Sequence, residues 1–198
     1  MIMVEKRFIS AEQLLQDSFE LGLSILESNF KPNYIVGVWR GGTPVGIAIQ
    51  ELLDWSGIET DHISIRTSLY SGINERKREV RVHGLNYVVK QIDAEDRLLI
   101  VDDVFDTGLS IQAVIHELRR QCRKNAPHDI RVATPYFKPA NNKTDFSPHY
   151  HVHKTDQWLV FPHELHGLSL EEIETQKPGP AAVLAKLKRW HNANRDCD

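Results

Sequence analysis

The sequence predicts an α/β fold in which an open, twisted and mainly parallel sheet is flanked by helices. Three observations support this prediction. Apolar runs typical of buried strands, such as residues 33–39 and 97–102, alternate with segments of helical periodicity. Both runs end in a glycine-containing turn that leads directly into a predicted helix. With 198 residues, 41% of them hydrophobic, the chain can also bury a full core.

Composition excludes several classes of protein. The formal net charge of -3 gives no support to a general nucleic-acid binder. The two cysteines, Cys122 and Cys197, are poorly placed for a structural disulfide, so we expect a cytoplasmic protein. We expect neither a signal peptide nor a membrane partner, because residues 1–10 lack an apolar core and no apolar run is long enough to span a bilayer.

The first half of the chain begins with a capping box at Ser10 and Gln13, which opens a helix that ends near residue 28. A buried strand is predicted at residues 33–39, and a helix is predicted from Thr43, as N-cap before Pro44, to about residue 54. Further elements are a strand at residues 63–70 and a polar, mobile lid loop at residues 71–84, where the alternating Val80 and Val82 allow short edge pairing.

The second half continues the alternation and then changes character. The expected elements are strands at residues 87–92, 97–102, 130–137 and 158–161 and a helix at residues 107–124. Ser169 and Glu172 form a second capping box, residues 178–180 (PGP) break that helix, and a last helix spans residues 181–193. We expect residues 1–140 to form the α/β core, with residues 141–198 as a small hood and helical tail of the same domain.

The most informative segment is residues 99–110 (LIVDDVFDTGLS), where a buried strand delivers Asp102 and Asp103 to its carboxyl end. A turn with Gly108 follows, and a helix starts at once. Ligands bind at this edge of open α/β sheets, and the free N–H groups of a helix N-terminus suit a phosphate. Thr107 and Ser110 add hydroxyl donors. Two adjacent carboxylates suit the hydroxyls of a sugar or a magnesium ion.

This segment resembles the signature with which type I phosphoribosyltransferases bind 5-phosphoribosyl 1-pyrophosphate (PRPP). The resemblance implies that Asp102 and Asp103 hold the ribose hydroxyls, directly or through magnesium and water. The residues implied to cradle the 5-phosphate, largely through backbone N–H groups, are Asp106, Thr107, Gly108, Leu109 and Ser110. Asp106 is also implied to be the general base that accepts or shares a purine proton.

Residues 39–44 (WRGGTP) form a second loop between a strand and a helix. Its glycines allow a ligand to approach the backbone closely, and Arg40 offers a forked donor for phosphate oxygens. The matching loop of the family binds pyrophosphate and contains a cis peptide bond without proline. The resemblance therefore assigns PRPP binding to Arg40 and Gly41 and places the cis bond between Trp39 and Arg40. The alternative is an ordinary turn.

The chain is most similar to the purine (hypoxanthine, guanine or xanthine) members of the family. Lys138, held before Pro139, matches the lysine that donates to the exocyclic oxygen of a 6-oxopurine; the alternative is a surface lysine. Trp158 and Leu159 match the hood strand, where an aromatic ring stacks on the purine and backbone groups read its edge. The alternative is that Trp158 belongs to the core.

Two further segments carry expectations. Ser68 and Tyr70 resemble the Ser-x-Tyr opening of the family's closing lid, which implies that Tyr70 binds PRPP. For the lid itself, residues 71–84, the alternative is a solvated surface loop. The basic lid residues are Arg76, Lys77, Arg78 and Arg81. His149, His151 and His153 alternate on one strand face, and we expect an exposed insertion there rather than a zinc site.

The resemblance implies a magnesium-dependent transfer of the phosphoribosyl group from PRPP to hypoxanthine, guanine or xanthine, which yields a nucleoside 5′-monophosphate and pyrophosphate in purine salvage. A homodimer or homotetramer is expected. Two alternatives stay open: a regulatory protein that binds PRPP or a nucleotide without turnover, and an enzyme for a pyrimidine base.

Overall fold

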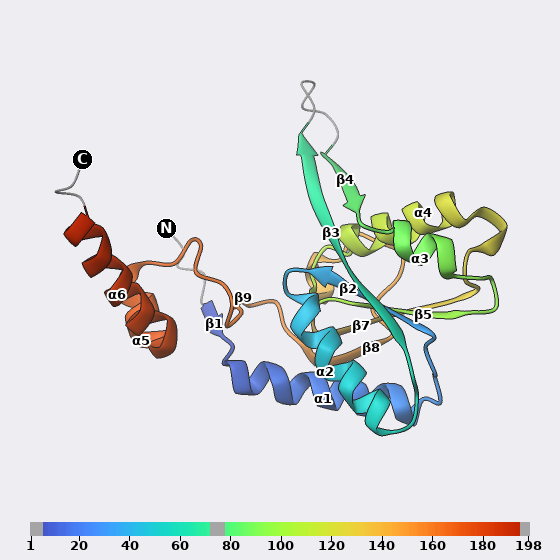
Figure 1. Ribbon diagram of the computed structural model, residues 1–198, viewed down its shortest axis with the longest axis horizontal. Coiled ribbons are helices and arrows are strands. Elements are labelled where there is room, and N and C mark those ends of the chain that lie inside the picture. The colour runs from blue at the N-terminus through green and yellow to red at the C-terminus, as the bar shows by residue number, and fades with distance from the viewer. Residues whose placement is uncertain (1–5, 72–77, 195–198) are drawn as a thin grey trace. The chain divides into compact units, whose positions relative to one another are not determined.

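The computed structural model describes residues 6–71 and 78–194 and divides the chain into two compact units (Figure 1). The larger unit spans residues 11–157, and the smaller one combines residues 1–10 with residues 158–198. Residues 141–157, which were expected at the start of the hood, belong to the larger unit, because strand β8 (Tyr150–Lys154) pairs there with strand β7 (Asp129–Phe137).

Within the described residues, the larger unit contains a seven-stranded sheet ordered β4-β3-β2-β5-β7-β6, with β8 beside β7. The other strands are β2 (Tyr34–Trp39), β3 (Asp61–Ser71), β4 (Arg78–His83), β5 (Arg97–Val101) and β6 (Val104–Phe105). Among the described strands of this sheet, all neighbouring pairs are parallel except β3 with β4. The predicted fold class is therefore confirmed. Because β2 and β5 are parallel neighbours, their carboxyl ends lie at the same edge of the sheet.

Helices cover both faces of this sheet. Figure 1 shows α1 (Ala11–Glu27) and α2 (Gly42–Trp55) on one side and α3 (Asn86–Gln91) and α4 (Leu109–Cys122) on the other. One core cluster is formed by buried apolar residues of the strands and α4, among them Val36, Val38, Leu98, Ile100, Val114 and Leu118. Burying each such side chain stabilises the fold by roughly 1.5–3 kcal/mol, so the sheet is a rigid support for the loops at its edge.

The strand predicted at residues 87–92 is wrong, because this segment forms the short helix α3. Tyr87, Val88 and Val89 are residues that favour strands, which explains the prediction. The buried residues follow a helical spacing instead, since Leu85, Val88 and Ile92 pack into the core. Tertiary packing therefore decides the local structure here.

The edge pairing expected around Val80 and Val82 is confirmed. Strand β3 continues to Ser71, and β4 returns antiparallel to it, with Val80 opposite Leu69 and Val82 opposite Thr67. Residues 72–77, which include Arg76 and Lys77 of the expected lid, lie outside the described residues, so the lid stays a prediction.

The expectation that residues 149–153 form an exposed insertion is wrong. Strand β8 adds to the sheet beside β7, and its first residue, Tyr150, is buried. His153 Nε2 lies 2.9 Å from Oδ1 of Asp17, a buried carboxylate of α1 that also accepts a hydrogen bond from Tyr136. Within residues 6–71 and 78–194, no group of three or more His, Cys, Asp or Glu side chains is arranged to hold a metal ion.

The smaller unit pairs strand β1 (Lys6–Phe8) in parallel with β9 (Trp158–Val160) and adds helices α5 (Leu170–Gln176) and α6 (Pro178–Asn194). The capping box at Ser169 and Glu172 is present as predicted. Lys177 is buried between the two helices' ends, and its ammonium group donates to the carbonyl oxygens of Phe161 and Glu164. None of the described helices has the length and apolarity needed to cross a membrane.

Candidate active site

Two adjacent carboxylates stand at the carboxyl end of β5. The Asp103 N–H donates to Oδ1 of Asp102 over 3.0 Å, and the Asp102 carboxylate also accepts from the backbone N–H of Gly42. Burial, followed by the charge of Asp103, raises the pKa of Asp102 well above its usual range. Keeping both carboxylates ionised is therefore costly here, and a cation or the hydroxyl donors of a ligand would offset that cost.

The loop after β2 packs directly against these carboxylates. The peptide bond between Trp39 and Arg40 is cis, as predicted. A methyl group on Gly41 would overlap the Asp103 carboxylate, and one on Gly42 would overlap the carbonyl of Val101. Both positions therefore require glycine, because only glycine allows the two loops to approach this closely. Gly42 already opens α2, so the predicted N-cap at Thr43 is wrong.

The expected phosphate turn follows β6 and leads into α4. Gly108 has a φ of +75°, and a side chain there would also meet the Phe105 ring at 2.6 Å and Thr144 Oγ1 at 2.8 Å. Thr107 Oγ1 accepts a hydrogen bond from the N–H of Leu109, where α4 begins. The free N–H groups of this helix end therefore lie beside the turn, an arrangement that suits a phosphate.

A pocket of about 220 Å³ opens at this turn. Its lining residues are Asp102, Asp103, Val104, Phe105, Asp106, Thr107, Gly108, Ser110 and Ile111. The structure thus gathers in one cavity most of the residues implied to bind ribose and phosphate. The side chain of Leu109 is the exception, since it lines a separate hollow between α4 and β4.

Lys138 reaches the same site from the end of β7. It is only 9% exposed, so the alternative of a surface lysine is wrong. Its Nζ lies 3.7 Å from Oδ2 of Asp106. The Lys138 N–H donates to the carbonyl of Phe105 over 2.9 Å, which fixes the lysine's backbone to the strand that precedes the turn.

Sequence reasoning missed Asn141 at this site. Its Nδ2 donates to Oδ1 of Asp106 over 2.8 Å, so the carboxylate has Lys138 near one oxygen and Asn141 on the other. No motif marks Asn141 in the sequence. The one available signal is its place two residues after Pro139, because a residue so close to a lysine expected to bind the base can share its site.

The other residues predicted to bind the base or PRPP lie in the smaller unit or have side chains outside the described residues. Trp158 is 58% exposed in the smaller unit, so the alternative that it belongs to the core is wrong, and its neighbour Leu159 is buried there. The backbone of Tyr70 belongs to β3, but its side chain lies outside the described residues. Stacking by Trp158 and PRPP binding by Tyr70 stay predictions.

Comparison with known proteins agrees with the resemblance stated for the sequence. Residues 10–167 match the family model described as the phosphoribosyl transferase domain. A curated relative, the hypoxanthine-guanine phosphoribosyltransferase of Bacillus subtilis, is 26% identical over 147 residues, which cover 72% of this chain and 74% of the relative.

Solved structures share the architecture. A purine phosphoribosyltransferase from Pyrococcus horikoshii is 29% identical, with a TM-score of 0.66 over 83% of this chain and 97% of that one. A hypothetical protein from Neisseria gonorrhoeae with bound ppGpp is 17% identical, with a TM-score of 0.72 over 91% of this chain and 99% of that one. The second likeness concerns the fold alone.

Proposed function

The chain belongs to the phosphoribosyl transferase family and is an enzyme of the purine phosphoribosyltransferase class, and we propose that it transfers the 5-phosphoribosyl group of PRPP to a 6-oxopurine. The products would be a nucleoside 5′-monophosphate and pyrophosphate, as in purine salvage. The observation that carries the proposal is the packing of Gly41 and Gly42 against Asp102 and Asp103, beside the pocket of the 105–111 turn.

Each part of PRPP has a matching group at this edge of the sheet. The 5-phosphate is placed on the N–H groups of the turn at Thr107 and Gly108 and at the start of α4. The ribose hydroxyls are assigned to Asp102 and Asp103. The pyrophosphate is assigned to Arg40 and the N–H groups of the adjoining glycine loop, because guanidinium and backbone donors both suit phosphate oxygens.

Magnesium fits the same carboxylates. The pKa of Asp102 is raised because its carboxyl is desolvated beside Asp103, so a cation would relieve the cost of keeping both carboxylates ionised. We propose that Asp102 and Asp103 hold the ion directly or through water. When bound, it would offset the negative charge of the departing pyrophosphate.

The purine is assigned to the side of the pocket where Lys138 and Asp106 meet. As a ring nitrogen of the purine bonds to the anomeric carbon, the bond from that carbon to the pyrophosphate oxygen breaks, and the proton on the purine passes to Asp106. Lys138 donates a hydrogen bond to the exocyclic oxygen, which an amino group in that position would not accept. This contact favours a 6-oxopurine over adenine.

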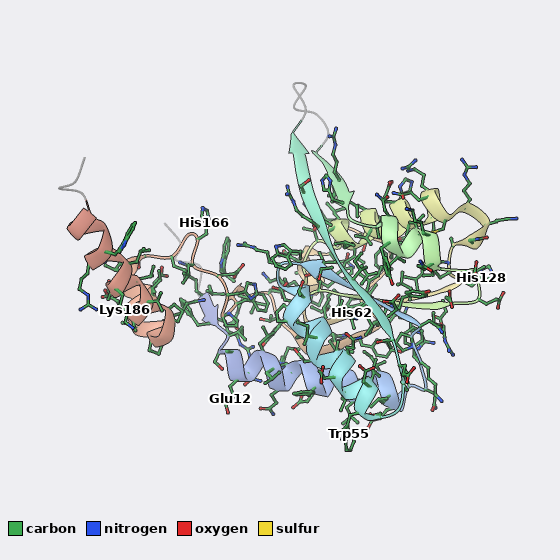
Figure 2. All side chains as sticks on the ribbon, in the orientation of Figure 1. Glu12, Trp55, His62, His128, His166 and Lys186 are labelled. Atoms are coloured by element: carbon green, nitrogen blue, oxygen red, sulfur yellow. The ribbon has the colours of Figure 1, made fainter. Side chains whose placement is uncertain are left out.

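We also propose that the enzyme is a homodimer or homotetramer. Large apolar side chains are exposed on α1 and α2, namely Leu15, Phe19, Leu23, Ile47 and Trp55. Trp55 is 86% exposed, and Figure 2 shows it pointing outward from the end of α2. Association of copies would cover such side chains and remove their apolar area from water. A cytoplasmic location stays a prediction.

The experiment that tests the proposal measures pyrophosphate release from PRPP with magnesium and each nucleobase in turn. We expect release only when PRPP, magnesium and a 6-oxopurine are all present. For Asp103→Asn we expect the rate of release to fall by at least about 100-fold, on the order expected for losing a group that binds in the transition state. The matched control is Asp54→Asn, an exposed carboxylate of α2. Tight PRPP binding without pyrophosphate release would favour a regulatory protein. Pyrophosphate release with a pyrimidine would favour an enzyme for a pyrimidine base.

A further inference from the structure

Asp106 is held from two sides, and one of its partners has no role in the function proposed above. Asn141 Nδ2 donates to Oδ1 of Asp106 over 2.8 Å, while Lys138 Nζ lies 3.7 Å from Oδ2. The 3.7 Å separation is longer than a hydrogen bond, so the lysine attracts the carboxylate without fixing it. The hydrogen bond from Asn141 is the contact that sets the orientation of the carboxylate.

The orientation needs to be set because the Asp106 side chain is 43% exposed and lies next to a cation. A freely rotating carboxylate could turn toward Lys138 and form a direct, charge-assisted hydrogen bond with its ammonium group. This contact would occupy Asp106, the proposed general base, and Lys138, the proposed donor to the purine, at the same time. With Oδ1 engaged by Asn141, Oδ2 stays directed to the side where Lys138 and the incoming base meet.

The amide of Asn141 is itself placed by the backbone. Asn141 ends a 3-10 turn that runs from Pro139, and its N–H donates to the carbonyl of Lys138 over 3.2 Å. The Lys138 N–H donates a hydrogen bond to the carbonyl of Phe105, and the Lys143 N–H donates one to the carbonyl of Thr107 over 3.0 Å. The segment that carries Asn141 is therefore fastened to the phosphate turn before and after it.

The neighbouring Asn142 provides the local structure, which leaves Asn141 for Asp106. Asn142 Nδ2 donates to the carbonyl of Phe146, and its Oδ1 accepts from the N–H and the hydroxyl of Thr144. All of these bonds close the loop on itself. The side-chain amide of Asn141, by contrast, donates a hydrogen bond out of the loop to the carboxylate of Asp106.

We propose that Asn141 is a positioning residue that aims the carboxylate of Asp106 at the purine. This inference rests on the proposed function, because it takes Asp106 as the group that receives the purine proton. Asn141 then acts through Asp106 and touches neither PRPP nor the base in this account. Its loss affects the chemical step rather than the binding of PRPP.

The test compares steady-state kinetics of three variants of the full chain with the wild type. We expect Asn141→Ala to lower kcat by about 3- to 30-fold, the range for losing one hydrogen bond to a partly exposed charged group, with the KM for PRPP within about twofold. Asn141→Asp should lower kcat further, because it is nearly isosteric but replaces the donor with a second carboxylate that repels Asp106.

Asn142→Ala is the matched control. We expect it to lower Tm more than Asn141→Ala does, because it loses several loop bonds, and to change kcat by less than about threefold. The inference is overturned if Asn141→Ala or Asn141→Asp keeps the wild-type kcat, or if Asn141→Ala lowers Tm and every kinetic constant in the manner of Asn142→Ala. A wild-type chain that releases no pyrophosphate with any 6-oxopurine overturns the proposed function and this inference together.

Discussion

Lys138 Nζ lies 3.7 Å from Oδ2 of Asp106, although the two residues follow different strands of the sheet. The lysine stands at the end of β7 and the aspartate in the turn before α4. This proximity joins the site assigned to the purine to the site assigned to the ribose 5-phosphate. The residue proposed to read the base and the residue proposed to receive its proton therefore lie side by side.

Replacing Asp106 with asparagine should remove the proton acceptor and keep the shape of the turn. We expect Asp106→Asn to lower kcat by about 10²–10⁴-fold, the usual contribution of a general base, while PRPP still raises the Tm of the variant. Steady-state product assays measure kcat, and thermal denaturation with and without PRPP measures the rise in Tm. The control is Asp145→Asn, an exposed carboxylate in a nearby loop, and a variant at position 106 with wild-type kcat would remove Asp106 from the mechanism.

Removing the Lys138 ammonium group should act on the base and spare PRPP. We expect Lys138→Ala to raise the KM for a 6-oxopurine by about 10- to 100-fold, because a hydrogen bond from a charged donor to the exocyclic oxygen is lost. The KM for PRPP should change by less than about threefold, and Lys143→Ala, an exposed lysine of the same segment, should change neither constant. Equal losses for base and PRPP would show that Lys138 does not read the base.

The pair of carboxylates at the end of β5 should cost stability in the free enzyme. Burial and the charge of Asp103 raise the pKa of Asp102, so its ionised form is less favourable in the folded state than in the unfolded state. At neutral pH, Asp102→Asn removes this charge. We expect the free energy of unfolding to rise by about 1 kcal/mol and Tm by about 2–4 °C.

The same substitution should abolish the magnesium-dependent rise in Tm that PRPP causes in the wild type, because the neutral amide is a poorer ligand for the ion and the ribose hydroxyls. Differential scanning calorimetry with and without magnesium and PRPP measures both effects. A lower Tm for free Asp102→Asn, together with an intact response to PRPP, would contradict this assignment.

Local patterns predicted most of the fold and the centre of the site. The apolar runs of β2 and β5 and the acid-rich turn before α4 are continuous in the sequence, so their structures follow from neighbouring residues. The features that the sequence did not predict depend on contacts with residues far away in the chain. Strand β8 is held through His153 by Asp17 of α1, and α3 forms from strand-favouring residues because Leu85 and Ile92 pack into the core. Asn141 was missed for the same reason, since only the folded chain brings it to Asp106.

Strand β8 should make stability depend on pH. Burial, with the charge of Lys154 as a smaller cause, lowers the pKa of His151, and its Nδ1 is buried without a hydrogen-bond partner among the described residues. The unfolded state therefore binds a proton first as the pH falls through about 6.5, and stability is lost on acidification below that value. Urea denaturation between pH 5 and 8, at roughly half-unit steps across the histidine range, measures this loss.

The variant His151→Gln removes the titrating ring, and we expect a smaller fall in the free energy of unfolding between neutral pH and about pH 5 than in the wild type. His128→Gln, at an exposed histidine just before β7, serves as the control for replacing a histidine by glutamine as such. Equal pH dependence for His151→Gln and the wild type would show that the buried ring is not the source.

The most direct test of the account is a panel of kcat/KM values for PRPP-dependent nucleotide formation, measured with hypoxanthine, guanine, xanthine, adenine, uracil and orotate on the wild type and Lys138→Ala. We expect the kcat/KM for at least one 6-oxopurine to exceed that for adenine and for both pyrimidines by at least about 100-fold, the discrimination that a hydrogen bond to the exocyclic oxygen allows. In Lys138→Ala we expect this ratio of kcat/KM values to be smaller. Nucleotide formation with adenine or a pyrimidine at the highest rate, or no formation with any base, would contradict the assignment of this chain as a 6-oxopurine phosphoribosyltransferase.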